Sequence, residues 1–588
     1  MVSDEALREH FDAMGCAVKE TAVLQKCMDL CDLYNLDEET FVDKWIAFAL
    51  LRFKTIDLTL DGLGMMERVE LKRVDRKVPE ARLEQDLSKL AVYSPHATKD
   101  EGENILEMYG GKHLNTPKAK RLRSPESEQG EQDSKVRAIG ETLSPSTYTL
   151  KTGTPSRRPV RVGTRILVSI GQEVTSWKCG SAQKVEVQKT EDPHVPSNSM
   201  YMFELITRKG EILTRVCWDV GQRLCGHWQK LKGDDMQSTW NVTLKSQMAF
   251  RTWGRICCER EGKLNVASIL LEGAKSPNTV KGIPIIKLDL SSIPQYSVFR
   301  GQVVAVEGCN PTGNVLVAKE MFVESFAPFP KSPYLKENVT IFVAAGPFTM
   351  SGDLDYQPLT DLLQSVMENE PNVLILVGPF VDFSHPEIRS PSITLTFQEF
   401  FEKIVGRIMD AVKGLCTQVV LIPSHRDAHH HPVYPTPEFA LFGPRYPNLH
   451  LMPDPSMLNI EGLIMGVTAV DVFMHLGREE FSANASGINK LNRLATHILD
   501  QKCFYPLNPP ALEVNLDTHL WEKYAFMYQQ PHILILPSDM RYFCKCLNNS
   551  VVINPERLCK HTYARLNVRP VSGGAWTTDN VSCEIIKI

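Results

Sequence analysis

The chain has 588 residues, of which 43% are hydrophobic and 23% are charged, and its formal net charge is -5. This composition predicts a mostly globular protein, and at roughly 100–200 residues per domain it predicts three or four folding units. The net negative charge argues against a protein whose whole surface binds nucleic acid, although it leaves room for a local basic patch. No apolar run approaches the roughly 20 residues that span a bilayer, so we expect no membrane association.

The 15 cysteines are scattered along the chain and form no CxxC pair. Close pairs such as Cys27 and Cys31 lack the spacing of a zinc ribbon. We therefore expect reduced, buried thiols, as in cytosolic and nuclear proteins, and no metal or other cofactor.

Residues 1–78 have the apolar periodicity of a small all-α bundle. Ser3 or Asp4 can cap a first helix that ends at Gly15, and Asp37 can cap a third helix. The second and fourth helices are predicted at Thr21–Tyr34 and from about Thr59 to Arg73. Four short helices leave little room for a deep pocket, so we expect a docking domain for other proteins, with purely structural support as the alternative.

Residues 79–157 lose this periodicity and are rich in Ser, Pro, Glu and Lys. Such a composition cannot bury enough surface to offset chain entropy, so it predicts a disordered linker. Packed cations on an exposed strand are typical of nuclear import signals. The candidate nuclear localisation residues are Lys118, Lys120, Arg121 and Arg123, and an ordinary solvated basic run is the alternative.

Five Ser-Pro or Thr-Pro steps lie in the same linker and predict phosphorylation by proline-directed cell-cycle kinases. Arg157 follows Thr154 at the +3 position that these kinases prefer. Each phosphate would change the local charge by up to about two units. The candidate phosphorylation sites are Ser94, Thr116, Ser124, Ser144 and Thr154.

Residues 158–325 contain short apolar runs separated by Gly-marked turns, which predicts a small β-barrel of the OB-fold type. The clearest run is Val298–Glu307, where the mid-strand Gly301 suits a bent barrel strand. The other predicted strands are Arg165–Ile170, Met200–Thr207, Glu211–Trp218, Ala249–Ile256, Ser268–Leu271 and Asn314–Lys319.

OB-folds often bind single-stranded nucleic acid through exposed aromatic rings above a basic groove. In this segment Trp240, Phe250 and Trp253 lie near Lys245, Arg251 and Arg255. Alternating strand residues normally place aromatic rings in the core, so we expect a packing and interaction module with little or no direct DNA binding. Single-strand binding by the barrel is the alternative.

Residues 338–588 alternate apolar strands with amphipathic helices, which predicts an α/β sandwich. The early strands are Val339–Ala345, Asn372–Val377 and Gln418–Ile422, and the helices between them are Leu359–Asn369 and Thr396–Gly414. Later strands are predicted at Gly462–Leu476, His532–Leu536, Val551–Ile553 and Thr562–Val568.

The three early strands end in Ala345-Gly346-Pro347-Phe348, in Gly378-Pro379-Phe380-Val381-Asp382 and in Pro423-Ser424-His425-Arg426-Asp427. This order resembles the calcineurin-like metallophosphoesterases, whose strand ends carry DxH, GDxxD and GNHD. The resemblance covers residues 338–588 and implies an α/β sandwich of the metallophosphoesterase type. Enzymes of that family need two divalent cations held by carboxylate, His and Asn donors.

Most of those donors are missing from this chain. Proline replaces the bridging carboxylate of the second motif, and the late strands carry no GHxH. The resemblance therefore implies an inactive domain without catalytic or metal-binding residues, with residual phosphodiesterase activity as the alternative. The degenerate positions of the former metal site are Ala345, Pro347, Pro379, Asp382, Ser424, His425 and Asp427.

His429, His430 and His431 follow this site in an unbroken run. Three consecutive histidines can hold a metal adventitiously, but in regular structure they cannot all face one ion. A polar surface loop from Asp427 to Pro437 is the preferred interpretation.

Taken together, a helical module, a linker, a barrel and an α/β domain without metal ligands resemble the B subunits of the replicative DNA polymerases. The segments that carry this resemblance are Val343–Phe348, Leu376–Asp382, Pro423–Asp427 and Asn554–Leu558. It implies a nuclear, non-catalytic scaffold subunit that binds the C-terminal zinc-binding domain of a catalytic subunit. It also implies links to primase, and to other replisome proteins through the N-terminal helical domain. The missing CxxC pairs agree with this, since the zinc would belong to the partner.

Within this family the long linker after a helical module favours the alpha–primase branch over the delta branch, whose B subunit resembles the two-domain core alone. The epsilon branch also carries an N-terminal helical module and is the nearer alternative.

Overall fold

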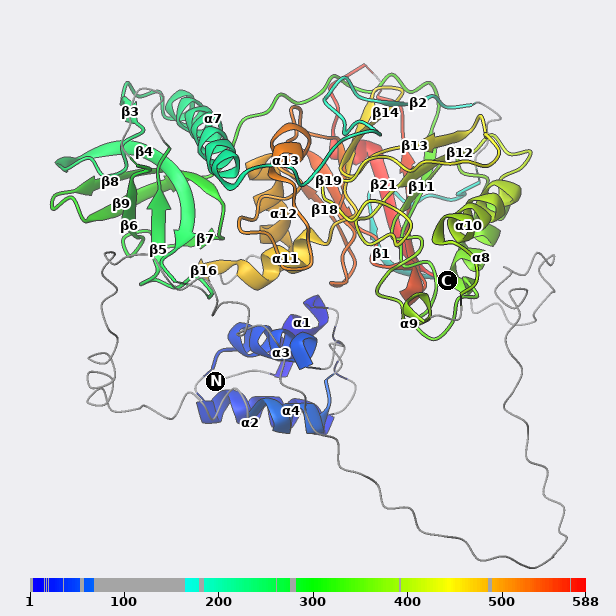
Figure 1. Ribbon diagram of the computed structural model, residues 1–588, viewed down its shortest axis with the longest axis horizontal. Coiled ribbons are helices and arrows are strands. Elements are labelled where there is room, and N and C mark those ends of the chain that lie inside the picture. Colours follow the sequence, from blue (N-terminus) through cyan, green and yellow to red (C-terminus); the bar gives the residue numbers. More distant parts are fainter. Residues whose placement is uncertain are drawn as a thin grey trace, which may run out of the picture. The chain divides into compact units, whose positions relative to one another are not determined.

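The computed structural model describes residues 4–14, 16, 18, 21–34, 36–52, 58–67, 164–178, 184–260, 262–274, 282–390, 393–484, 489–571 and 573–588 (Figure 1). The whole of the predicted linker, residues 79–157, therefore lies outside the described residues. The same holds for its basic run, Lys118, Lys120, Arg121 and Arg123, and for its candidate phosphorylation sites, Ser94, Thr116, Ser124, Ser144 and Thr154. Among the described residues, no helix has the length and hydropathy needed to cross a bilayer.

The N-terminal segment forms the four predicted helices. They are α1 (Asp4–Ala13), α2 (Thr21–Tyr34), α3 (Glu38–Arg52) and α4 (Leu60–Met66). Their apolar stripes meet in a small core, where the rings of Phe11 and Phe41 pack edge to face with centroids 6.4 Å apart and Trp45 is fully buried. The 3.6-residue spacing of apolar side chains is what produces such one-sided burial.

The middle of the chain forms a closed β-barrel, as expected. Its strands are β3 (Ser238–Thr239), β4 (Ser246–Cys258), β5 (Ile269–Glu272), β6 (Ile285–Asp289), β8 (Val303–Asn310) and β9 (Val315–Phe322). They follow the order β3-β4-β5-β6-β9-β8, and β8 also pairs with β4, which closes the sheet on itself. Alternate residues of these strands fill one apolar core, which includes Ile256, Leu271, Leu288 and Val306.

Two strands predicted for the barrel are wrong. Met200–Thr207 falls mostly on an irregular segment, and Glu211–Trp218 falls on a long helix, α7 (Ile206–Lys232). The buried residues of α7 include Ile212, Val220 and Leu224, and they recur at the spacing of a helical face rather than every second residue. A short window rich in Ile, Val and Trp does not separate these two periods, which is why the prediction failed.

Two further strand predictions need correction. Arg165–Ile170 (β1) pairs with the C-terminal strand β21 of another sheet and not with the barrel. The run Val298–Glu307 is not one bent strand, because it divides into β7 (Tyr296–Val298) and β8 at Gly301. Gly301 has φ +97, and a Cβ at this position would overlap Asn508 N, so the chain turns here because only glycine fits.

The rest of the chain forms two sheets. The seven-stranded sheet has the order β1-β21-β20-β10-β11-β12-β13, and the six-stranded sheet has the order β18-β19-β17-β15-β14-β2. The first contains β10 (Val339–Ala345), β11 (Val373–Val377), β12 (Gln418–Ile422), β13 (Leu449–Leu451), β20 (Thr562–Val568) and β21 (Val581–Lys587) with β1. The second contains β2 (Val187–Lys189), β14 (Ser456–Ile460), β15 (Leu463–Val467), β17 (Ile533–Ile535), β18 (Phe543–Leu547) and β19 (Ser550–Asn554).

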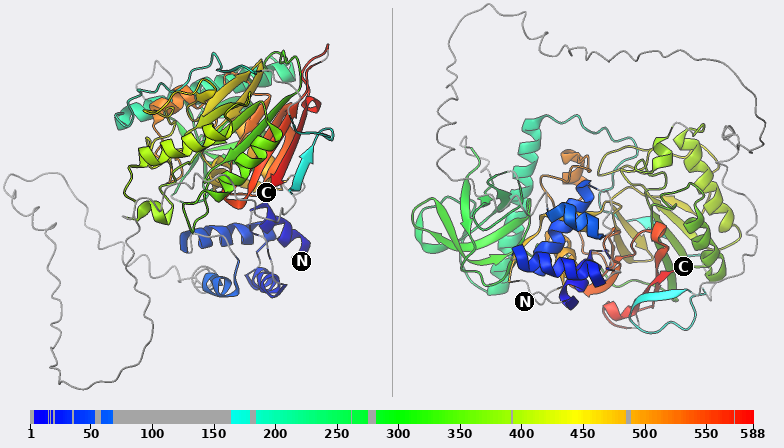
Figure 2. Two further views of the ribbon diagram at one scale, coloured as in Figure 1. Left: turned by 90° about the vertical axis from the view of Figure 1, so that its right-hand side faces the viewer. Right: turned by 90° about the horizontal axis from the view of Figure 1, so that it is seen from below.

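The two sheets pack face to face. Alternate residues of β10, such as Ile341 and Val343, join one core with Met465 and Ile533 of the other sheet. The residues between them, such as Phe342, face a second core. That core is covered by α8 (Gln357–Asn369) and α10 (Phe397–Ala411), which lie on the outer side of the seven-stranded sheet (Figure 2). The period-2 alternation of a strand explains why one run of apolar residues serves both layers.

The remaining helices lie in the connections. They are α9 (Pro386–Arg389), α11 (Val472–Glu479), α12 (Lys490–Gln501) and α13 (Thr518–Tyr524), and a short strand β16 (Phe481–Ala483) pairs with β7. The predicted strand Gly462–Leu476 is therefore wrong in its second half. Asp471 caps α11 there by accepting a hydrogen bond from Met474 N at 3.0 Å, a start signal that its sequence position could have indicated.

Candidate functional site

Three strand ends meet at one edge of the seven-stranded sheet. Strands β10, β11 and β12 are parallel, and their register places Ala345 beside Val377 and Val377 beside Ile422. The ladder continues for one residue past each strand, because Gly346 N donates to Val377 O at 2.7 Å and Gly378 N donates to Ile422 O at 2.8 Å. The three segments singled out in the sequence are therefore neighbours in space.

The two glycines at this edge permit a close approach of the turns. A Cβ on Gly378 would lie 2.6 Å from Asp427 Oδ2, and a Cβ on Gly346 would overlap the carbonyl oxygen of Pro379. Ala345 is buried between the sheets, and neither Pro347 nor Pro379 carries a side-chain donor or acceptor. At these positions of the predicted former metal site, close packing of the backbone takes the place of a metal ligand.

Asp427 ties two of the turns together. Its Oδ1 accepts hydrogen bonds from Phe380 N at 2.6 Å and Val381 N at 2.9 Å, and its Oδ2 accepts one from Ser424 N at 2.9 Å. Burial raises the pKa of Asp427 to about 7, against the lowering effect of these three N–H groups. The carboxylate thus links the turn after β11 to the turn after β12 through hydrogen bonds.

Asp382 is engaged by an arginine that the motif comparison had passed over. Its Oδ1 accepts from Arg426 Nε at 3.3 Å, and its Oδ2 pairs with Arg426 Nη2. Arg426 belongs to the turn after β12, so this ion pair links the same two turns as Asp427 does.

A second arginine lies across the two sheets. Arg557 is 1% exposed, and its Nε lies 3.2 Å from Asp539 Oδ1 while its Nη2 lies 3.3 Å from Asp471 Oδ2. Its Nη1 donates to Gly346 O at 3.3 Å, which brings in the end of β10. Burial raises the pKa of Asp539, but the charges of Arg557, Arg426 and Lys560 outweigh this effect and hold the pKa below its usual value.

A cleft of about 180 Å³ is lined in part by Arg426, Asp471, Asp539 and Arg557. His425 lies on its wall with Nδ1 buried and without a hydrogen-bond partner, and burial lowers the pKa of His425 to about 4. On the far wall Glu513 accepts from Arg478 at 2.7 Å and pairs with His475 at 3.1 Å. The positive charges of the arginines in the cleft are therefore balanced by neighbouring carboxylates.

This set of residues does not fit a pair of divalent cations. The carboxylates of Asp382, Asp471 and Asp539 have guanidinium partners, and that of Asp427 is occupied by backbone N–H groups. In the part of the chain that the structure describes, no group of three or more His, Cys, Asp or Glu residues is arranged to hold a metal ion.

Sequence reasoning found the strand ends but missed the two arginines. Arg426 and Arg557 both lie in segments that carried the family resemblance. The metallophosphoesterase motifs define only the metal ligands, so they gave no reason to single out an arginine. A buried site that loses its cations must neutralise the carboxylates that remain, so a search for new cations beside them would have pointed to both residues.

The predicted polar surface loop is found only in part, because His431 and Pro432 are exposed while His429 and His430 are half-buried. Asp427 and the stretch from Val433 to Pro437 are buried. The ring of His429 stacks against Phe401 and Phe439, with centroids 4.1 and 5.1 Å away, and the two phenylalanine rings also contact each other. Both of its ring nitrogens are buried without a hydrogen-bond partner, and burial, with a smaller effect of His430, lowers its pKa to about 3.

We expect His429→Phe to stabilise the protein, and to do so most at low pH. The folded pKa of about 3 lies below the ordinary value of 6.5, so His429 stabilises the folded state above pH 6.5 and loses that contribution as the pH falls toward 3. At about pH 5 the titration accounts for roughly 2 kcal/mol, which phenylalanine would restore. Melting curves at pH 7.5 and pH 5 measure the gain.

The matched control is His431→Phe in the same run. This change removes the 3.0 Å hydrogen bond between His431 Nδ1 and Tyr201 Oη, so it should not stabilise the protein at either pH. An equal gain for His429→Phe at both pH values would contradict the assigned cause.

Most of the aromatic and basic residues considered for single-strand binding are buried, either in the barrel core or beneath α7. Phe250 and Trp253 are buried. Arg251 forms ion pairs with Asp234 and Glu307, while Arg255 pairs with Glu272. Trp253 lies under α7, which packs on β4 and β8. These side chains therefore do not form an open stacking platform for bases.

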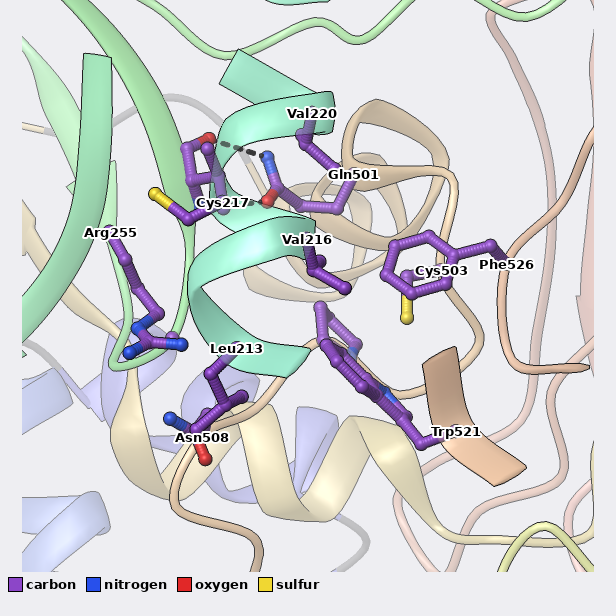
Figure 3. A pocket seen from close by; sticks show the side chains of 13 residues that line it. Leu213, Val216, Cys217, Val220, Arg255, Gln501, Cys503, Asn508, Trp521 and Phe526 are labelled. Atoms are coloured by element: carbon purple, nitrogen blue, oxygen red, sulfur yellow. Dashed lines mark hydrogen bonds between the residues drawn. The ribbon is translucent and has the colours of Figure 1, made fainter. Parts of the chain in front are cut away.

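A small apolar pocket of about 20 Å³ lies where α7 and the barrel meet the α/β part (Figure 3). Val216 and Leu213 of α7 face Trp521 and Phe526 across it, with Arg255 at one side. A space of this size holds about one water molecule. The pocket is a packed joint between the two parts rather than a site for an organic ligand.

Comparisons with known proteins match the whole length of the chain. Family models for the N-terminal domain of the DNA polymerase alpha B subunit, for the OB domain of the same B subunit, and for the DNA polymerase alpha/epsilon B subunit match residues 5–73, 210–324 and 341–545. The B subunit of DNA polymerase alpha from Drosophila melanogaster is 33% identical over 630 residues, covering 100% of both chains. This chain belongs to the family of DNA polymerase alpha B subunits. The expected OB domain is thereby confirmed.

Other members of the family give the same picture. The Bos taurus relative is 30% identical over 94% of this chain and 92% of its own, and the Saccharomyces cerevisiae relative is 27% identical over 56% and 55%. A solved structure of TT1561 from Thermus thermophilus covers 39% of this chain and 93% of its own at 13% identity, with a TM-score of 0.18, which supports no inference.

Proposed function

We propose that this chain is the non-catalytic scaffold subunit of DNA polymerase alpha–primase. In this role it binds the C-terminal zinc-binding domain of the catalytic subunit and links it to primase and other replisome proteins during the initiation of DNA replication. Relatives named as the B subunit of DNA polymerase alpha over nearly the full chain support this assignment over the delta and epsilon branches. A role in replication places the protein in the nucleus.

The arginine-filled cleft is the observation that carries the non-catalytic role. The resemblance of the strand ends to metallophosphoesterase motifs supports this role, and the three parallel strands bring their turns to one edge of the sheet. A hydrolase of that type needs two cations about 3.5–4 Å apart. Arg557 and Arg426 instead supply fixed positive charge to the remaining carboxylates. We infer that the domain has been kept for its surface.

The other parts of the chain have supporting roles in this proposal. The helices of residues 4–67 serve as a docking domain for replisome proteins. The linker, with its nuclear localisation run and its sites for cell-cycle kinases, gives this domain reach and regulation. The barrel acts by packing and protein contact and binds DNA little or not at all.

A binding experiment tests the proposal directly. The full chain is mixed with the purified, zinc-loaded C-terminal domain of the catalytic subunit, and the complex is measured by calorimetry and light scattering. We expect one copy of each chain with sub-micromolar affinity, unchanged when residues 1–67 are deleted. Chelating the partner's zinc should abolish binding without altering the melting of this chain. Failure of the intact proteins to associate would contradict the proposal.

A hydrolysis assay separates the enzymatic alternative. The full chain should not hydrolyse bis(p-nitrophenyl) phosphate in the presence of Mn²⁺ above the rate in buffer. Manganese-dependent turnover that His425→Ala abolishes would favour a phosphodiesterase, because His425 is the remaining imidazole of the former metal motif.

A further inference from the structure

The first turn of α12 carries two cations that are almost completely covered. Lys490 and Arg493 are each 8% exposed, and each meets an acidic residue of α3. Lys490 Nζ lies 2.7 Å from Asp43 Oδ1, and Arg493 Nη2 lies 3.0 Å from Glu39 Oε1. The two carboxylates lie one turn apart on α3 and the two cations lie one turn apart on α12, so one face of each helix takes part.

The two cations depend on α3 to different degrees. Arg493 also donates to Glu480, from Nε at 3.0 Å and from Nη2 at 3.1 Å, so its charge is matched within the α/β domain. For Lys490, Asp43 is the only ion-pair partner among the residues that the structure describes. A lysine is rarely this deeply buried unless its charge is paired. The pair of Lys490 with Asp43 is therefore the contact on which the docking of α3 depends.

The other features of this contact make it weak and reversible. A third ion pair joins Arg541 to Asp12 of α1 at 3.9 Å, and since both side chains are 45% exposed, it contributes little. The large apolar residues of α3, Phe41 and Trp45, are fully buried and belong to the core of the helices themselves. Contacts between charged side chains bind weakly and are screened by salt.

The covalent connection makes a weak contact sufficient. The sequence predicts a disordered linker at residues 79–157, between the helices and the rest of the chain. A disordered chain of this length has an average end-to-end distance of roughly 50 Å. It holds the two parts at an effective concentration of about 1 mM, so a contact with a dissociation constant of about 1 mM is closed in roughly half of the molecules.

We propose that the contact between α3 and α12 is a reversible autoinhibitory contact that holds the N-terminal helices against the α/β domain. In the closed state the acidic face of α3, Glu39 and Asp43, is covered. A partner that binds this face must carry cations of its own and displace those of α12. In the open state the helices reach as far as the linker allows. The inference concerns the chain alone and goes beyond its role as a scaffold.

Zero-length carbodiimide cross-linking of the full chain tests the closed state, because it joins an amine to a carboxylate only where the two touch. We expect a cross-link between positions 43 and 490 at low salt, and a yield lower by about fivefold or more at high salt. The cross-link should be lost in Asp43→Lys and should return in Asp43→Lys/Lys490→Asp, where the signs of the pair are exchanged. Deca-lysine should lower the yield by competing for the acidic face.

The matched control is Asp29→Lys, which makes the same change of charge at an exposed position of α2 and should keep the cross-link. Small-angle scattering gives a second measurement, since Asp43→Lys should enlarge the radius of gyration and Asp29→Lys should not. Melting curves like that of the parent show that the variants fold. Absence of the cross-link from the parent, or its presence only in dimers, would overturn the proposal. An unchanged radius of gyration in Asp43→Lys would overturn it as well.

Discussion

Gly221→Ala should destabilise the barrel by about 3 kcal/mol, although alanine normally favours a helix. Gly221 lies in the middle of α7, and a Cβ there would overlap the indole ring of Trp253. Trp253 is buried against Val220 and Leu224 of the same helix and packs edge to face with Trp218. Either α7 must lift from the sheet or the indole must leave its place. Calorimetric melting and hydrogen exchange along α7 measure the loss.

The same helix provides the control. A Cβ added to Gly226 of α7 would have no other atom within 4 Å, so Gly226→Ala should be neutral or stabilise by up to about 1 kcal/mol through helix propensity. Similar melting temperatures for the two alanine variants would show that the packing of Trp253 against α7 does not require glycine at position 221.

Arg557→Met should destabilise the α/β domain by about 2–4 kcal/mol, because it leaves the partly buried Asp471 and the half-exposed Asp539 without their cation. Asp471 would keep its hydrogen bonds from Met474 N, Ser538 Oγ and Asp539 N but lose its counter-charge. Thermal melting of variant and parent at pH 7.5 gives the difference.

Two companion variants sharpen this test. Arg557→Met/Asp539→Asn should recover part of the stability, because one of the two stranded charges is gone. Arg445→Met changes an exposed arginine of the same domain and should shift stability by less than about 0.5 kcal/mol. An Arg557→Met protein as stable as the parent would mean that the two sheets do not depend on this guanidinium.

The sequence predicted an element best where the spacing of its apolar residues fitted only one type of secondary structure. The strands Val339–Ala345, Gln418–Ile422 and Thr562–Val568 match β10, β12 and β20 because β-branched residues alternate between two apolar layers there. The helix Thr21–Tyr34 matches α2 for the corresponding reason at a period of 3.6. Local pattern decides such elements since both faces of each strand, or one stripe of the helix, must be buried.

Long-range pairing is what the pattern could not reveal. Nothing in Arg165–Ile170 indicates that its partner is β21, more than four hundred positions away. The same limit applies to the cleft, where Arg557 meets the turn after β10 through contacts that only the assembled sheets create. A loop of histidines looked polar, yet the stacking of His429 against Phe401 and Phe439 depends on α10 being packed beside it.

The pairing of β1 with β21 and of β2 with β14 makes the barrel an insertion within the α/β domain. The α/β domain opens before the barrel begins and closes only with the last strand of the chain. During synthesis, β1 must therefore wait until residues 581–587 leave the ribosome before it finds its neighbour. An expressed fragment that starts at residue 338 would leave unpaired edges on both sheets, which are templates for aggregation. Both ends of the barrel are connected to the α/β domain. Two chain segments rather than one therefore limit the rotation of the barrel relative to that domain.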